Sequence, residues 1–199
     1  MVLQKGLIKF IDSCKLPTEI ANFHLYAFKE NVINKEHLAI VLGSFDRSLP
    51  TLARIHCQCL TGESLFSLRC DCRFQLTESL KKIAKKGSGI VFYLQQEGRN
   101  IGLLNKIKAY KLQDQGLDTV EANHKLGFTD DPRDYKIVSA IAKYLGINSV
   151  DLMTNNPRKI TALKENGLLV NKRIPIKSKA TKYNRGYLKT KAKKLGHLL

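Results

Sequence analysis

Residues 149–163 read SVDLMTNNPRKITAL, and this stretch contains the local pattern that decides the fold. Its first five residues form a short β-rich run of the kind found in strands. Asn156 then stands directly before Pro157, which is the arrangement of a helix N-cap followed by proline at the first helical position. Ile160 and Leu163 follow on one face of the predicted helix. A strand that leads into a helix in this way predicts a mixed α/β domain.

The same alternation continues on both sides of this stretch. Short β-rich runs cover residues 37–42, 51–56, 89–94 and 149–153. Helical patterns cover residues 74–86, 133–145 and, in basic form, 187–198. No repeat or low-complexity linker separates these elements. We therefore expect one main domain over residues 1–177, and a basic C-terminal segment, 178–199, that belongs to the same domain or is partly mobile.

The composition of the chain excludes several classes of protein. With 199 residues, 43% hydrophobic and 26% charged, it can bury a core as one domain or two small ones without disulfides. It has no apolar run of the roughly 18 residues that a membrane span needs, and its N-terminal apolar run is too short for a secretory signal. We therefore expect a cytoplasmic protein. Four of its five cysteines crowd into positions 57, 59, 70 and 72, which suits a metal site in a reducing compartment.

The net charge of +17 is placed unevenly along the chain. Glu165 is the last acidic residue, and the 34 residues after it carry ten lysines and arginines. Such a segment favours a polyanionic partner, and nucleoside triphosphates are polyanions as well as nucleic acids. The plainer alternative is a solvated tail that keeps the protein soluble.

The cysteine cluster predicts a zinc site. Cys59, Cys70 and Cys72 offer three thiolates, the ligand that zinc prefers in tetrahedral geometry. With three protein ligands the fourth position stays open to water, as in catalytic zinc sites. With Cys57 as a fourth ligand the site would be closed and structural. The spacing alone leaves both alternatives open, together with buried cysteines that bind no metal.

Two polar loops that follow strands are candidate anion sites. Residues 96–100, QEGRN, bring a glycine and Arg99 to a turn before a helical stretch, where a phosphate can bind. Residues 154–159, TNNPRK, bring a hydroxyl and two cations to another helix start. For both loops the alternative is a simple connection between elements.

A third polar loop, residues 130–134, reads DDPRD. Its plain interpretation is that Asp131 caps a helix whose first residue is Pro132.

Taken in order, these segments resemble GTP cyclohydrolase II, the enzyme that opens riboflavin biosynthesis. The similarity is nearly end to end, and we expect the stand-alone form rather than the fusion with dihydroxybutanone phosphate synthase. The motifs that carry it are KLPT at 15–18, RIH at 54–56, CLTG at 59–62, SLRCDC at 67–72, QEGRNIGLL at 96–104, the LQDQG and DTVEAN motifs within 110–123, RDY at 133–135, TNNPRK at 154–159 and GHLL at 196–199.

The resemblance implies a fold, a reaction and cofactors. The fold is α/β, with a mixed, barrel-like β-sheet surrounded by helices, in a homodimer. Zinc is held by Cys59, Cys70 and Cys72, one ion per chain, and Mg²⁺ accompanies the triphosphate. The guanine imidazole ring of GTP is opened with release of formate and pyrophosphate, which gives 2,5-diamino-6-(5-phosphoribosylamino)pyrimidin-4(3H)-one.

The resemblance also implies roles for individual residues. Tyr110 would lie near the ring that opens, Asp131 would accept a proton, and Arg133 would attack the α-phosphate. Because a guanidinium stays protonated, stabilisation of charge is an equally good role for Arg133. The residues that would surround GTP are Arg54, Ile55, His56, Cys57, Gln58, Gln75, Glu97, Gly98, Arg99, Thr119, Thr154 and Lys159.

Five positions depart from the common pattern of the family. Cys57 and Gln58 replace a usual Ser-Glu pair, Arg73 a glycine, Gln95 an arginine and Pro132 an acid. Since relatives have serine there, we expect Cys57 to line the GTP pocket as a small, weakly polar residue. Together the departures leave open a paralogue with altered or lost cyclohydrolase activity.

A second alternative is a zinc-stabilised module that binds RNA through the basic C-terminal segment. Only Tyr183 and Tyr187 interleave the basic residues there, and no common RNA-binding motif occurs. We therefore expect GTP, and not nucleic acid, to be the partner.

Overall fold

The computed structural model of the protein describes residues 6–199. Residues 1–5, which open the predicted main domain and the apolar run at the N-terminus, lie outside the described residues. The described chain divides into two compact units, each built from three segments. The first contains residues up to 56, 77–95 and 134–176, and the second contains 57–76, 96–133 and 177–199. The predicted basic segment thus belongs to the second unit, while its assignment to a single domain with residues 1–177 stays a prediction.

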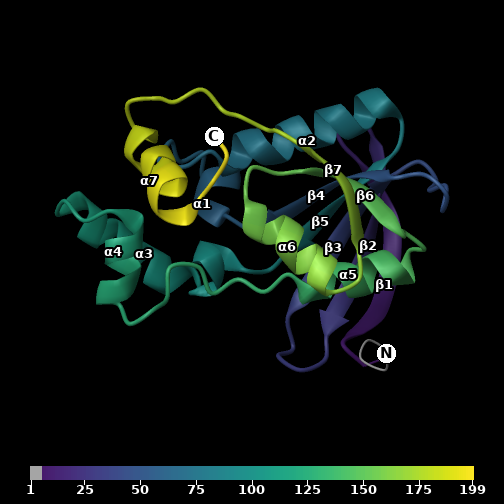
Figure 1. Ribbon diagram of the computed structural model, residues 1–199, viewed down its shortest axis with the longest axis horizontal. Coiled ribbons are helices and arrows are strands. Elements are labelled where there is room, and N and C mark those ends of the chain that lie inside the picture. The colour runs from purple at the N-terminus through teal and green to yellow at the C-terminus, as the bar shows by residue number, and fades with distance from the viewer. Residues whose placement is uncertain (1–5) are drawn as a thin grey trace. The chain divides into compact units, whose positions relative to one another are not determined.

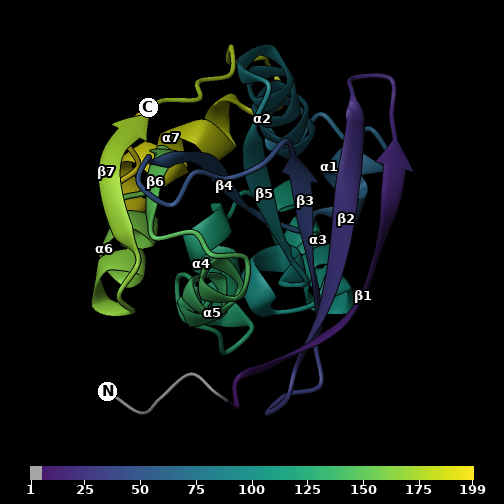
Figure 2. The ribbon, with the colours of Figure 1, turned by 90° about the vertical axis from the view of Figure 1, so that its right-hand side faces the viewer.

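The first unit is built on a seven-stranded sheet with the order β1-β2-β3-β5-β4-β6-β7. Figure 2 shows β1, β2, β3 and β5 side by side in this order. The strands are β1 (Ile8–Pro17), β2 (Asn22–Glu30), β3 (Glu36–Leu42), β4 (Thr51–Cys57), β5 (Gly89–Leu94), β6 (Ser149–Met153) and β7 (Leu169–Ile174). The four β-rich runs of the sequence are therefore strands, as predicted.

Pairing in the sheet is mixed. Strands β1, β2, β3 and β5 pair antiparallel, with Ala39 opposite Phe92 in the β3–β5 ladder. Strands β4, β6 and β7 pair parallel, with Val150 opposite both Thr51 and Val170. The sheet is open, with β1 and β7 at its edges. The predicted mixed α/β class is confirmed.

Helices cover this sheet with apolar faces. They are α2 (Cys72–Lys86), of which residues from 77 on belong to the first unit, α5 (Lys136–Tyr144) and α6 (Pro157–Glu165). Helix α6 begins as its sequence predicts, since Asn156 accepts a hydrogen bond from the backbone N–H of Arg158 and Pro157 occupies the first turn. Ile83 of α2, Ile141 of α5 and Leu163 of α6 are fully buried.

The second unit is mainly helical (Figure 1), and it contains Cys59, Cys70 and Cys72. Its elements are α1 (Leu60–Glu63), the first turn of α2, the 3-10 helix η1 (Glu97–Asn100), α3 (Leu103–Asp114), α4 (Thr119–Lys125) and α7 (Arg185–Leu195). Asp118 and Glu121 form a capping box at the start of α4. The sequence predicted a basic helix at residues 187–198. Helix α7 begins two residues earlier and ends at Leu195.

Two further findings concern the helices. The plain interpretation of residues 130–134 was wrong, because α5 begins only at Lys136, after Tyr135, and Asp131 caps no helix there. The carboxylate of Asp131 instead binds Arg133. Among the described helices, none combines the length and the apolar character that crossing a bilayer would need.

Leu152 tests the core of the first unit. Its side chain in β6 is fully buried, so Leu152→Ala leaves a cavity and should lower the free energy of unfolding by about 2–5 kcal/mol. Leu169 in the neighbouring strand β7 is 62% exposed, and Leu169→Ala should change the free energy by about 0.5 kcal/mol or less. Urea denaturation followed by circular dichroism measures both. An equal loss of unfolding free energy in the two variants would contradict the placement of Leu152 in the core.

Candidate active site

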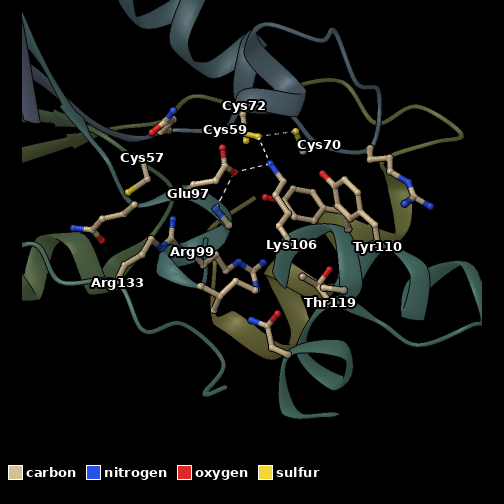
Figure 3. A pocket seen from close by; sticks show the side chains of 18 of the residues that line it. Cys57, Cys59, Cys70, Cys72, Glu97, Arg99, Lys106, Tyr110, Thr119 and Arg133 are labelled. Atoms are coloured by element: carbon tan, nitrogen blue, oxygen red, sulfur yellow. Dashed lines mark hydrogen bonds and ion pairs between the residues drawn. The ribbon is translucent and has the colours of Figure 1, made fainter. Parts of the chain in front are cut away.

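Three cysteine side chains form a compact cluster in the second unit (Figure 3). Cys59 stands directly before α1, and Cys70 and Cys72 stand where α2 begins. Their sulfurs all lie within 4.8 Å of one another, and the Cys59 and Cys70 sulfurs are 3.7 Å apart. This group could hold a metal ion. Cys57 does not belong to the group, and Figure 3 shows its sulfur apart from the other three.

Gly62 makes the close approach of the sulfurs possible. A Cβ added at this position would lie 2.6 Å from the Cys70 sulfur and 3.1 Å from the Cys59 sulfur. No real Cβ tolerates the first distance, so any larger residue would push the sulfurs out of place. The glycine in the CLTG motif is therefore required by the sulfur cluster itself rather than by an unusual backbone angle.

The charge of the cluster is concentrated on Cys59. Hydrogen bonds from the Cys70 and Cys72 thiols, helped by the nearby Lys106 ammonium, hold the pKa of Cys59 far below its usual range. The hydrogen bond to Cys59 raises the pKa of Cys70 to about 11, and that of Cys72 is raised well above its usual value for the same reason.

Lys106 connects the cluster to the polar loop at residues 96–100. From α3, its ammonium donates to the Cys59 sulfur at 3.1 Å and to Glu97 Oε1 at 2.8 Å. Glu97 Oε2 in turn accepts a hydrogen bond from the backbone N–H of Leu60, 2.7 Å away. Burial opposes the charge on Lys106, but the Cys59 thiolate and Glu97 together raise its pKa above the usual value. One buried cation thus joins α1, η1 and α3.

The cluster opens on a pocket lined entirely by residues of the second unit. Its lining combines the cysteine sulfurs with the cationic side chains of Arg99 and Arg133. The predicted site residues that line the pocket are Cys57, Gln58, Cys59, Cys70, Cys72, Glu97, Gly98, Arg99, Tyr110, Thr119 and Arg133.

Two other predicted residues of the second unit, Asp131 and Gln75, do not line the pocket. Asp131 holds Arg133 through two hydrogen bonds of 2.6 Å, from Nε and Nη2 of the guanidinium to its two carboxylate oxygens. Gln75 Nε2 donates to Asp71 Oδ2, also at 2.6 Å. Asp131 therefore acts on the pocket through Arg133.

The remaining predicted residues belong to the first unit, where they form a group of their own. Arg54 Nη1 donates to the carbonyl of Met153 at 2.9 Å, and Lys159 Nζ donates to the carbonyl of Ile55 at 2.9 Å. Thr154 Oγ1 accepts from the backbone of Asn156, and the ring of His56 stacks on that of Tyr93. The structure brings Arg54, Ile55, His56, Thr154 and Lys159 together where β4 and β6 end.

Sequence reasoning missed several residues that line the pocket. They include Arg69, Lys106, Gln113, Asn123 and Tyr187. Lys106 precedes Tyr110 by four residues and so shares its helix face, which is a signal the sequence offered. Tyr187 lies on the C-terminal helix, and no local pattern indicates its contact with a pocket so distant in sequence.

Two buried donors of the pocket have no hydrogen-bond partner within the described part of the chain. They are Nη2 of Arg99 and Nδ2 of Asn123. A buried donor without a partner is costly, and it is explained when a ligand supplies the acceptor. Arg99 also has a φ of +61°, a left-handed conformation that residues other than glycine seldom adopt. Such strain is typical of backbone held in place for binding.

The five departures from the family pattern separate into two groups. Cys57 and Gln58 line the pocket. The other three do not line it. The Arg73 guanidinium lies 4.1 Å from the centre of the Phe66 ring. The Gln95 side-chain oxygen accepts a hydrogen bond from the backbone N–H of Glu36 in β3, and the carbonyl of Pro132 accepts one from the Asn100 side chain. Only the Cys57-Gln58 pair therefore alters the chemistry of the lining.

Comparison with known proteins identifies relatives over nearly the whole chain. Residues 9–175 match the family described as GTP cyclohydrolase II. Two curated proteins named GTP cyclohydrolase-2, from Shewanella sediminis and Azotobacter vinelandii, are each 53% identical over 192 residues, which is 96% of this chain and 94% and 92% of theirs. A riboflavin biosynthesis protein of Vibrio vulnificus is 52% identical over 97% of this chain and 53% of its own length.

Among solved structures, the chain shares a fold with RibBX, a two-domain 3,4-dihydroxy-2-butanone 4-phosphate synthase from A. baumannii. The TM-score is 0.51 at 19% identity, and the match covers 85% of this chain and 41% of that one. This likeness concerns the fold alone.

Gly62 provides a direct test of the cluster geometry. Gly62→Ala should lower the metal bound per chain by at least about tenfold under chelator competition, because the new methyl group displaces the Cys70 and Cys59 sulfurs. Elemental analysis of purified protein measures this. Gly186→Ala is the control, since nothing lies within 4 Å of the added Cβ there. Metal content equal to wild type in Gly62→Ala would refute the geometry.

Proposed function

The chain belongs to the GTP cyclohydrolase II family, and we propose that it is a zinc-dependent enzyme that hydrolyses GTP in riboflavin biosynthesis. The guanine imidazole ring is opened, formate and pyrophosphate leave, and a pyrimidine product remains. The observation that carries this proposal is the cluster of three cysteine sulfurs at the wall of a pocket that Arg99 and Arg133 also line. A homodimer in the cytoplasm belongs to the proposal and rests on family resemblance.

The residues present fit a zinc ion with one position free. Cys59, Cys70 and Cys72 supply three sulfur ligands, while Cys57 stays outside the group. Zinc bound in this way supplies a water molecule of lowered pKa, which is the nucleophile that hydrolysis of a purine ring needs. The single ammonium of Lys106, 3.1 Å from Cys59, offsets part of the negative charge of three thiolates.

Tyr110 is suited to hold a proton beside the reacting ring. Burial raises the pKa of its phenol, so the hydroxyl remains protonated at neutral pH. It hydrogen-bonds the Thr61 hydroxyl at 3.2 Å, within the CLTG motif that follows Cys59. A protonated phenol so close to the cluster can donate a hydrogen bond to an oxygen or nitrogen on which charge develops.

Arg133 is better suited to stabilise charge than to act as a nucleophile. Its guanidinium is held in a two-point pair with Asp131, which favours the protonated, positively charged form. A protonated guanidinium has no lone pair with which to attack phosphorus. We therefore assign Arg133 to the phosphate charge that develops when pyrophosphate leaves, and Asp131 to the orientation of Arg133.

The triphosphate has further partners in the pocket. Arg99 offers the buried Nη2 donor, and Asn123 offers an amide donor to another polar atom of the ligand. Mg²⁺ would carry much of the remaining phosphate charge. The predicted contacts of Arg54, Ile55, His56, Thr154 and Lys159 with GTP remain part of the proposal, together with those of Gln75.

A direct assay distinguishes this function from its alternatives. Purified protein loaded with zinc is incubated with GTP and Mg²⁺, and formate, pyrophosphate and a new pyrimidine absorbance are measured. All three should appear together. A paralogue with lost chemistry would bind GTP without releasing formate. Salt-sensitive RNA binding without GTP turnover would support the RNA-binding alternative, which the pairing of Lys191 and Lys194 with acidic side chains already makes less favourable.

Four cysteine variants separate the three zinc ligands from the cysteine that only lines the pocket. Cys59→Ser should lose zinc and ring opening, because a neutral hydroxyl does not replace a thiolate, and Cys70→Ser and Cys72→Ser should do the same. Cys57→Ser should keep one zinc per chain and keep its activity. Metal analysis and formate release measure both. Full zinc occupancy in any of the first three would remove that residue from the ligand set.

Arg133 allows the two halves of the reaction to be separated. Arg133→Ala should keep its zinc, because the three cysteine sulfurs supply the ligands and Arg133 is held by Asp131, but should release pyrophosphate at least about a hundredfold more slowly. Arg133→Lys keeps a positive charge but cannot form the two-point pair with Asp131. Its rate of pyrophosphate release should therefore lie between those of wild type and Arg133→Ala. Pyrophosphate release at the wild-type rate in Arg133→Ala would contradict the assignment.

A further inference from the structure

The C-terminal helix α7 presents two different faces. Tyr187, Lys191 and Lys194 are spaced four and three residues apart and so share one face. Lys189 and Lys193, which lie on other faces, are exposed. Lys191, in contrast, is only 8% exposed, which is rare for a lysine and requires a partner. The basic segment is therefore not uniformly solvated.

The partner of Lys191 is Asp71, the residue between two cysteines of the cluster. The ammonium donates to Asp71 Oδ1 at 2.8 Å, while Gln75 Nε2 donates to Oδ2 of the same carboxylate at 2.6 Å. Asp71 is only 4% exposed, so its charge depends on these donors. Because Asp71 joins Cys70 to Cys72, rotation of the backbone there would break both contacts.

Other contacts hold α7 in the same place. Lys194 forms ion pairs with Asp118 and Glu121, the two residues of the capping box of α4. Tyr187 lines the pocket, and its ring centre lies 4.4 Å from the Lys191 ammonium. The same face of the helix thus contacts α4, the pocket and the segment that carries two sulfurs.

We propose that Lys191 is a positioning residue of the metal site, and that through Asp71 it keeps the Cys70–Cys72 segment in the geometry of the three-sulfur cluster. The proposal rests on the zinc site proposed above and extends it to the C-terminal helix. Interactions outside the ligands commonly change metal affinity by 10–100-fold, because they fix the orientation in which the ligands are offered. Lys191 does so through one buried ion pair.

Zinc affinity is the first measurement, because it does not require GTP turnover. The full-length Lys191→Met protein should bind zinc at least about tenfold more weakly than wild type in competition with a chromogenic chelator. Lys193→Met makes the same substitution on an exposed position of the same helix and should differ from wild type by less than about twofold. Lys191→Arg, which keeps the charge, should recover most of the loss.

The ion pair itself is tested by a double variant. Lys191→Met leaves the buried Asp71 carboxylate without its cation, whereas Asp71→Asn combined with Lys191→Met removes both charges. The double variant should therefore bind zinc more tightly than Lys191→Met alone. A simple loss of packing by α7 would instead make the double variant equal to or worse than the single one, which would overturn the proposal.

Hydrogen exchange in metal-free protein keeps this test independent of the proposed function. Peptides that cover residues 69–73 should exchange faster in Lys191→Met than in wild type or Lys193→Met, even if the protein never turns over GTP. Unchanged exchange together with unchanged zinc affinity in Lys191→Met would overturn the role of Lys191. Failure of GTP turnover alone, with the zinc and exchange effects present, would contradict only the proposed reaction.

Discussion

The approach of three sulfurs to one point is the constraint on which the rest of the site depends. Cys59 and Cys70 are eleven residues apart in sequence, yet their sulfurs are 3.7 Å apart. That distance is possible only because Gly62 has no side chain in the space between them. Helix α1, the loop after it and the first turn of α2 are therefore shaped around the cluster. Their exposed apolar residues, such as Phe66, show that burial is not what holds this loop.

The residues packed around the cluster balance its charge. Thiolates concentrate negative charge in a partly buried place, and two lysines approach it from two different segments of this unit, 96–133 and 177–199. Lys106 contacts Cys59 directly and is itself balanced by Glu97. Lys191 contacts Asp71 between the other two cysteines. Each ammonium is buried and paired, so removal of one partner leaves a charge that the fold cannot solvate. The pocket, in turn, has cations left for a polyanion, notably Arg99.

The sequence predicted those features that depend on local spacing. The three cysteines, the cap at Asn156 and most helices are set by neighbouring residues, and the structure contains them. Strands β1, β2 and β7 were missed, and the two edge strands among them, β1 and β7, have no fully buried position and show little apolar alternation. Lys191 was missed because its contact with Asp71 joins residues 120 positions apart, which no local pattern encodes. Lys106 shares a helix face with Tyr110, but its contact with Cys59, 47 positions away, has no local pattern either. The interpretation of Asp131 as a cap failed because pairing with Arg133 competes with capping.

The central claim is that the metal has three protein sulfurs and one free position. X-ray absorption at the zinc edge of the wild-type protein tests this directly, because sulfur and oxygen ligands lie at clearly different distances, about 2.3 and 2.0 Å. The account predicts three sulfurs and one oxygen or nitrogen ligand, since Cys57 lies outside the cluster. Four sulfurs around the metal would contradict it, because a closed site leaves no place for the water that hydrolysis consumes.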